Sequence, residues 1–138
     1  MTDTEIVRPA TVLALFTLIV VLLMGLKRLR SQLINQTTEG DYKYGESAAV
    51  PVEIGIFNRN YMNLLELPVL FYLASIIVLI IDGTDKTFLN LAWSYAALRI
   101  VHSTIHLTYN RVLHRSIVFA ASNGVLAIMW IRIMLAVW

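Results

Sequence analysis

The sequence has no cysteine, only three prolines and six glycines, and few charged residues for its length. Without cysteine the chain has no disulfide framework, no thiolate metal site and no catalytic thiol of its own, so any thiol chemistry must use a thiol that a ligand brings. Charged residues make up 14% of the 138 residues, whereas a soluble domain carries about 25%. The formal net charge of +2 is too small to indicate a nucleic-acid partner.

Hydrophobic residues dominate the remaining composition. They make up 58% of the chain, and the mean hydropathy is +0.70. This apolar excess is concentrated in long runs, which is typical of segments that have a lipid bilayer as their solvent. The sequence therefore predicts an all-α membrane protein with one domain over residues 1–138, built as an up-down bundle of four transmembrane helices.

The four helices are expected at about 9–30, 52–81, 87–111 and 115–138. Each is near the roughly 20 residues that cross about 30 Å of hydrocarbon. An acidic segment precedes the first run, which lacks a small-residue cleavage site, so we interpret this run as a retained helix and not as a signal peptide. Pro68 lies inside the second run and predicts a kink, because proline lacks a backbone donor.

Basic residues decide the predicted topology, because Lys and Arg are enriched in cytoplasmic connections. The connection after the first helix and the turn before the fourth are basic, and the opposite side is less so. The residues concerned are Lys27, Arg28, Arg30, Lys43, Arg111 and Arg115, against Arg8, Lys86 and Arg132. The first and third connections should therefore face the cytosol, and both termini should lie on the non-cytosolic side.

Polar side chains interrupt the second and third runs at helical spacing. Arg59, Asn63 and Glu66 are four and three residues apart, which places them on one helix face. The third run carries a second such face, with Arg99, His102, His106 and Tyr109, and with Ser103 and Asn110 at its margin. Arg115 opens the fourth run. The predicted topology brings all three groups to the cytosolic half, where charges in membrane helices mark a functional site.

Each polar residue also has a structural interpretation. Arg59 and Glu66 could form a pair that locks two helices, and Asn63 could join helices through a hydrogen bond. Arg99 could serve structure alone. Arg115, at a helix end, could be a plain topology residue.

His102 and His106 are four residues apart, a spacing that could suit a pair of metal ligands. No third ligand of the HExxH type accompanies them, so we predict no metal site.

The charges of the three polar groups indicate the kind of ligand. Arg59, Arg99 and Arg115 against Glu66 leave a surplus of two positive charges when the histidines are neutral. Guanidinium groups match carboxylates in geometry, and Glu66 would suit an ammonium group. Glutathione carries two carboxylates, an ammonium group and a thiol, but the charges alone do not single it out.

The polar motifs resemble those of the MAPEG family (membrane-associated proteins in eicosanoid and glutathione metabolism). Arg59 to Glu66, followed by Pro68, resembles its helix-two pattern R-x-x-x-N-x-x-E with a nearby proline. Arg99 to His106 resembles its R-x-x-H/Y-x-x-x-Y stretch. Arg115 follows Arg99 by sixteen residues, a spacing seen in the microsomal prostaglandin E synthase branch. The resemblance covers nearly the whole chain and is closest to uncharacterised bacterial-type members.

The resemblance implies a homotrimer, in the bacterial inner membrane, that binds glutathione between subunits near the cytosolic face. By position, Arg115 would be the catalytic residue that stabilises the glutathione thiolate. The residues implied to bind glutathione are Arg59, Asn63, Glu66, Arg99, His102, His106 and Tyr109. His106 stands where the family usually has tyrosine, and Tyr109, one turn further on, is a candidate substitute.

The implied function is that of a glutathione-dependent transferase or peroxidase, which conjugates or reduces lipophilic small molecules that arrive through the membrane lipid. The alternative within the same fold is a non-enzymatic lipid-binding or scaffolding protein. A small transporter or channel is a third possibility, but it predicts a conducting path lined by the polar faces together with inverted repeats, and we see no such repeats in the sequence.

Overall fold

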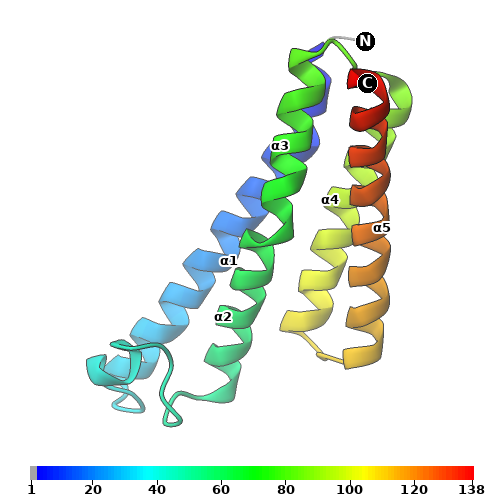
Figure 1. Ribbon diagram of the computed structural model, residues 1–138. Helices are drawn as coiled ribbons and strands as arrows, with labels where there is room; N and C mark the ends of the chain where they lie inside the picture. The colour runs from blue at the N-terminus through cyan, green and yellow to red at the C-terminus, as the bar shows by residue number, and fades with distance from the viewer. Residues whose placement is uncertain (1–2) are drawn as a thin grey trace.

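The computed structural model describes residues 3–138, which form an all-helical bundle without a strand (Figure 1). In chain order the elements are η1 (Asp3–Ile6), α1 (Val7–Leu33), η2 (Glu39–Tyr42), α2 (Val52–Leu65), α3 (Leu67–Ile80), α4 (Lys86–Leu107) and α5 (Val112–Val137), where η1 and η2 are single turns of 3-10 helix. The helices run up and down, so both termini lie at one end and the α1–α2 and α4–α5 connections at the other (Figure 1).

The second predicted helix is broken into two. Glu66 separates α2 from α3, with φ −76° and ψ −94°, far from the helical ψ of about −42°. Pro68 lies in the first turn of α3, where its missing N–H is tolerated. The same missing donor leaves the Leu64 carbonyl without its helical partner. The kink expected from Pro68 is therefore a break of one residue.

The connection between α4 and α5 lies earlier in the chain than the sequence predicted. Helix α4 ends at Leu107 and not near 111, and α5 begins at Val112 and not at 115. Asn110 has a positive φ of 47°, and its N–H bonds the carbonyl of Ile105 at 2.8 Å. Asparagine tolerates this left-handed conformation, which ends helices. Arg115 consequently lies in the first turn of α5.

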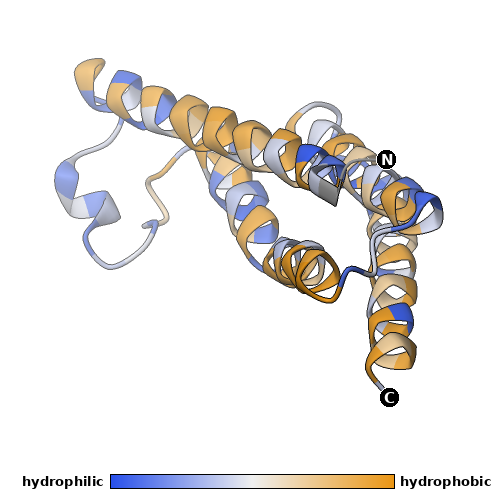
Figure 2. Cartoon of the chain, turned by 90° about the horizontal axis from the view of Figure 1, so that it is seen from above, coloured by the Kyte–Doolittle hydropathy of each residue, from blue (hydrophilic) through white to orange (hydrophobic). Residues whose placement is uncertain are grey.

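Three of the helical segments are long and apolar enough to cross a membrane. They are Thr4–Leu33, Val52–Ile80, which includes the break, and Val112–Val137. The sequence predicts four spans, but α4 is not among these three. It is less apolar than they are and carries polar residues such as Arg99 and His106 on its buried face. Figure 2 shows hydrophobic residues over most of the helical surface and a largely hydrophilic loop after α1.

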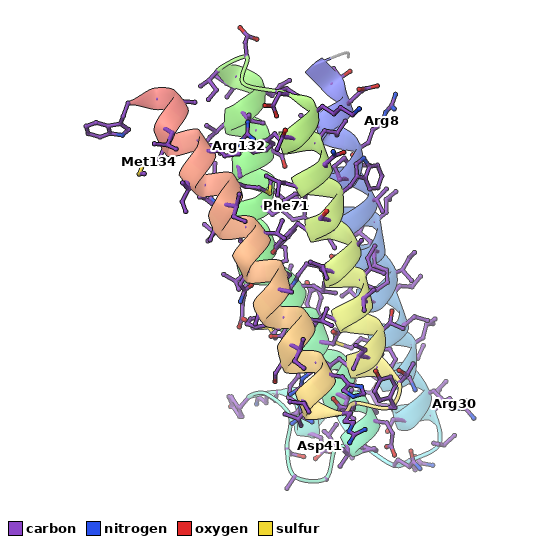
Figure 3. All side chains as sticks on the ribbon, turned by 90° about the vertical axis from the view of Figure 1, so that its right-hand side faces the viewer. Arg8, Arg30, Asp41, Phe71, Arg132 and Met134 are labelled. Atoms are coloured by element: carbon purple, nitrogen blue, oxygen red, sulfur yellow. The ribbon has the colours of Figure 1, made fainter. Side chains whose placement is uncertain are left out.

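The two ends of the bundle have different interiors. Toward the termini the core is apolar: the rings of Phe71 and Tyr95 lie 4.6 Å apart, and Phe71 lies inside the bundle in Figure 3. Toward the other end the interior also holds polar side chains, namely Asn60, Arg99, His102, Ser103 and His106, beside apolar ones such as Leu64 and Ile105. Many large apolar side chains, such as Leu22 and Ile76, point outward, as expected for a surface that contacts lipid.

Candidate functional site

An open cleft of about 670 Å³ lies between α2 and the facing parts of α4 and α5. Its volume is in the range of small-molecule sites, which is roughly 300–1,000 Å³. The sequence-predicted residues that line it are Arg59 and Asn63 from α2, Glu66 at the break that follows, His102 and His106 from α4, and Arg115 from α5. These side chains, from three separate segments, meet in the half of the bundle that holds the α1–α2 and α4–α5 connections (Figure 1).

Arg59, Asn63 and Glu66 form one side of the cleft, here called the α2 wall, and helical spacing explains why they lie together. Arg59 and Asn63 lie along one face of α2, and Glu66 follows at its carboxyl end. This side is open in the single chain, because Arg59 and Glu66 are exposed and Asn63 is half-buried. Within residues 3–138 neither Arg59 nor Glu66 takes part in a salt bridge. Their charges are therefore available to a ligand or to another chain.

The α4 wall is held to both neighbouring helices by its histidines. The Nδ1 atom of His102 bonds the backbone carbonyl of Arg115 at 3.1 Å, and that of His106 lies 3.3 Å from Oδ1 of Asn60. Asn60 also donates from Nδ2 to Oγ of Ser103 at 2.6 Å. The two imidazole rings are 6.1 Å apart at 49°, with their Nδ1 atoms turned to acceptors on different helices. These hydrogen bonds connect α4 to α2 and to α5.

Arg115 is fixed at the mouth of the cleft by the α4–α5 connection. Its Nη1 donates to Oδ1 of Asn110 at 2.8 Å, and its side chain is half-buried. One of its five N–H donors is thus used to orient the guanidinium group. The group can therefore present a fixed positive charge to a ligand in the cleft.

Arg99 and Tyr109, which the sequence placed on the same face as the histidines, do not line the cleft. Arg99 is fully buried, donates from Nη2 to the backbone carbonyl of Asn63, and has its guanidinium carbon 5.4 Å from the ring centre of Phe119. Tyr109 is 60% exposed, and its hydroxyl lies 3.2 Å from Nδ1 of His114.

Sequence reasoning missed several residues of the cleft and its support. Ser116, directly after Arg115, and Phe119, one turn beyond it, line the cleft from α5, and Met62 lines it from α2. Extending the helical stripe from Arg115 by four residues would have found Phe119, whereas the position of Ser116 next to Arg115 gives no such signal. Asn60 lies off the α2 stripe, so only its polarity in a membrane helix gave a signal.

The comparisons with known proteins give one match. The model of the MAPEG family matches residues 6–135, a range that includes every residue that lines the cleft. No curated protein and no solved structure gives a match.

Proposed function

The chain belongs to the MAPEG family, and we propose that it is a membrane glutathione transferase or peroxidase that acts on lipophilic small molecules. The family includes glutathione-dependent enzymes of both kinds as well as other members. The observation that supports an enzymatic role is the meeting of Arg59, Glu66 and Arg115 in one cleft with two histidines. A protein that only binds lipid has no evident need for this set of charges.

The charges of the cleft complement those of glutathione. Two arginines and one glutamate line the cleft, which leaves one positive charge when the histidines are neutral. The third arginine, Arg99, lies behind the wall and not on it. Glutathione carries two carboxylates and one ammonium group, so its net charge is opposite in sign. The guanidinium groups of Arg59 and Arg115 would bind the carboxylates, and Glu66 would bind the ammonium group.

Arg115 would stabilise the glutathione thiolate in the proposed reaction. Glutathione supplies a thiol, and its thiolate is the nucleophile toward an electrophile or a hydroperoxide. A cation beside the sulfur favours the thiolate over the thiol. Arg115 would fill this role because Asn110 holds its guanidinium group and His102 holds its backbone.

The exposed charges of Arg59 and Glu66 support assembly with neighbouring subunits, and the family resemblance leads us to propose a homotrimer. Arg59 and Glu66 lie in the span Val52–Ile80, and both are exposed in the single chain. Charged groups that face hydrocarbon are unfavourable by several kcal/mol. We therefore place a neighbouring subunit over this face, so that glutathione would bind between subunits.

The polar α4 would complete a fourth span inside the bundle. Its 22 residues rise about 33 Å, enough for about 30 Å of hydrocarbon. The end that carries Arg30 and the cleft would face the cytosol, and both termini would lie on the other side of a bacterial inner membrane. Figure 3 shows Arg30 and Asp41 at that end and Arg8 and Arg132 at the opposite one.

Glutathione binding to the purified protein in detergent tests the proposal. We expect calorimetric binding and an ultraviolet difference signal of the thiolate, together with turnover of a lipophilic electrophile. Arg115→Ala should retain the assembly but lose the thiolate signal. Binding without a thiolate and without turnover in the native protein would instead support the lipid-binding or scaffolding alternative.

A further inference from the structure

The break at Glu66 leaves a backbone carbonyl without its helical partner. In a continuous helix the carbonyl of Asn63 would accept the N–H of Leu67. The ψ of −94° at Glu66 turns that N–H away, and this bond is not formed within residues 3–138. Helix α3 begins instead with the N–H of Val69 bonded to the Glu66 carbonyl at 3.3 Å. The Asn63 carbonyl thus remains at the carboxyl end of α2, which carries partial negative charge.

Arg99 binds this carbonyl from the neighbouring helix. Its side chain is fully buried, and Nη2 donates to the Asn63 oxygen. No carboxylate lies within salt-bridge distance of it in residues 3–138. A cation is favoured at the carboxyl end of a helix, so the end of α2 supplies part of the stabilisation that a counter-ion would give. The break therefore frees a carbonyl that can accept from Arg99, and this carbonyl gives the buried guanidinium group a partner.

The residue that Arg99 holds is itself part of the cleft. Asn63 lines the cleft with its side chain, while its carbonyl is bound from behind, and Glu66 follows one turn later. We propose that Arg99 is a positioning residue, which fixes the α2 wall by binding the backbone carbonyl freed at the break. The contact would position the α2 wall whichever ligand occupies the cleft.

A distance measurement tests the inference without any ligand. The chain has no cysteine, so nitroxide labels on Val52→Cys and Leu113→Cys would report the separation of α2 from α5. Both positions are exposed, and neither lines the cleft. Labelled chains diluted with unlabelled ones should give a narrow distance distribution. Arg99→Gln should shift or broaden it, whereas Arg99→Lys, whose ammonium can still donate to the carbonyl, should restore most of the native distribution.

Pro68→Ala tests the contact between Arg99 and the Asn63 carbonyl independently. Alanine restores the N–H at position 68 and allows the helix to continue, so that Leu67 can take the Asn63 carbonyl from Arg99. This variant alone should shift the distance. Arg99→Gln should then add little in the Pro68→Ala background, because the contact it removes is already lost. A role of Arg99 in core packing alone would give two additive effects.

Glutathione binding tests the proposed function, whereas the distance measurement tests the role of Arg99, so the two can fail separately. Arg99→Gln should weaken binding by about tenfold, because the displaced α2 wall no longer holds its side chains in the binding geometry, and Arg99→Lys should recover most of the affinity. Failure of the native protein to bind glutathione would remove the proposed function but leave the distance test intact. An unchanged distance in a folded Arg99→Gln protein would overturn the inference. If that variant does not assemble, an unchanged distance in Pro68→Ala would overturn it equally.

Discussion

The imidazole of His102 joins α4 to the first turn of α5 by donating from Nδ1 to the backbone carbonyl of Arg115, 3.1 Å away. A carbonyl oxygen can only accept, so Nδ1 carries the proton of the neutral ring. The ring also lies 5.4 Å from that of Phe119, which lines the cleft. His102 thus controls the backbone of the residue proposed to stabilise the thiolate.

Two substitutions of His102 distinguish the effect of its bond to the Arg115 carbonyl from the effect of the ring itself. Asparagine places an amide N–H near the position of Nδ1, whereas phenylalanine keeps a ring but has no donor. We expect His102→Phe to lower the thiolate fraction of bound glutathione severalfold, and His102→Asn to lower it much less. The ultraviolet difference signal at saturating glutathione measures both. Equal losses in the two variants would argue that ring volume or Nε2 matters more than the bond to Arg115.

The α2 wall was predictable from the sequence because helical periodicity is local. Arg59, Asn63 and Glu66 share a face in any helix with their spacing, and the structure places all three on the cleft. Histidines 102 and 106 reach the same cleft from α4 for the same reason. The match of the MAPEG family over residues 6–135 likewise agrees with the resemblance that these motifs carry.

The placements of Arg99 and Tyr109 were not predictable in this way. Arg99 shares a helix face with His102, but one turn earlier in the chain that face meets the carboxyl end of α2. The kink was predictable from Pro68, but the residue of α4 that meets it is set by how the two helices pack. Tyr109 lies beyond the last residue of α4, Leu107, where Thr108 adopts ψ −99°. Helical spacing has no meaning past that point, and the left-handed Asn110 that follows carries no strong signal in sequence.

Glu66→Gln tests the proposed contact with the ammonium group of glutathione. The substitution keeps shape and removes one charge, so the loss should reflect one charge-assisted hydrogen bond, about tenfold in affinity. Calorimetry in detergent measures it. Glu53→Gln is the matched control, because Glu53 is an exposed carboxylate in the first turn of α2, the helix that ends at the break before Glu66, and does not line the cleft. Equal affinities of Glu66→Gln and the native protein would contradict the contact.

Asn60→Ala tests the polar connection between α2 and α4. Asn60 is fully buried and bonds both Ser103 and His106. Its removal leaves two buried groups without a partner, so we expect a destabilisation of about 1–3 kcal/mol and a lower melting temperature in detergent. Asn90→Ala, at an exposed position on α4, should change the melting temperature little. Similar shifts for the two variants would show that the connection does not stabilise the bundle.

The contacts of Asp85 make the free energy of unfolding depend on pH. They lie at the end of the bundle that carries the termini. Asp85 lies in the connection before α4, where Oδ1 accepts the N–H of Phe88 at 2.6 Å and Oδ2 pairs with Arg132 at 2.6 Å. The bond from Phe88 holds the pKa of the Asp85 carboxyl below its usual value, and Arg132 lowers this pKa further. Because the folded pKa is below the unfolded one, the stabilisation is complete above the unfolded pKa and is lost as the pH falls through the folded pKa.

Asp85→Asn isolates the charge in this interaction, because asparagine caps helices about as well as aspartate. The variant should melt at a lower temperature than the native protein at about pH 6, and the difference should shrink toward about pH 3 as the native carboxylate is protonated. Thermal unfolding in detergent across this range measures the difference, in which the titration of the other carboxylates cancels. Two melting curves that stay parallel with pH would show that the Asp85 charge does not contribute to stability.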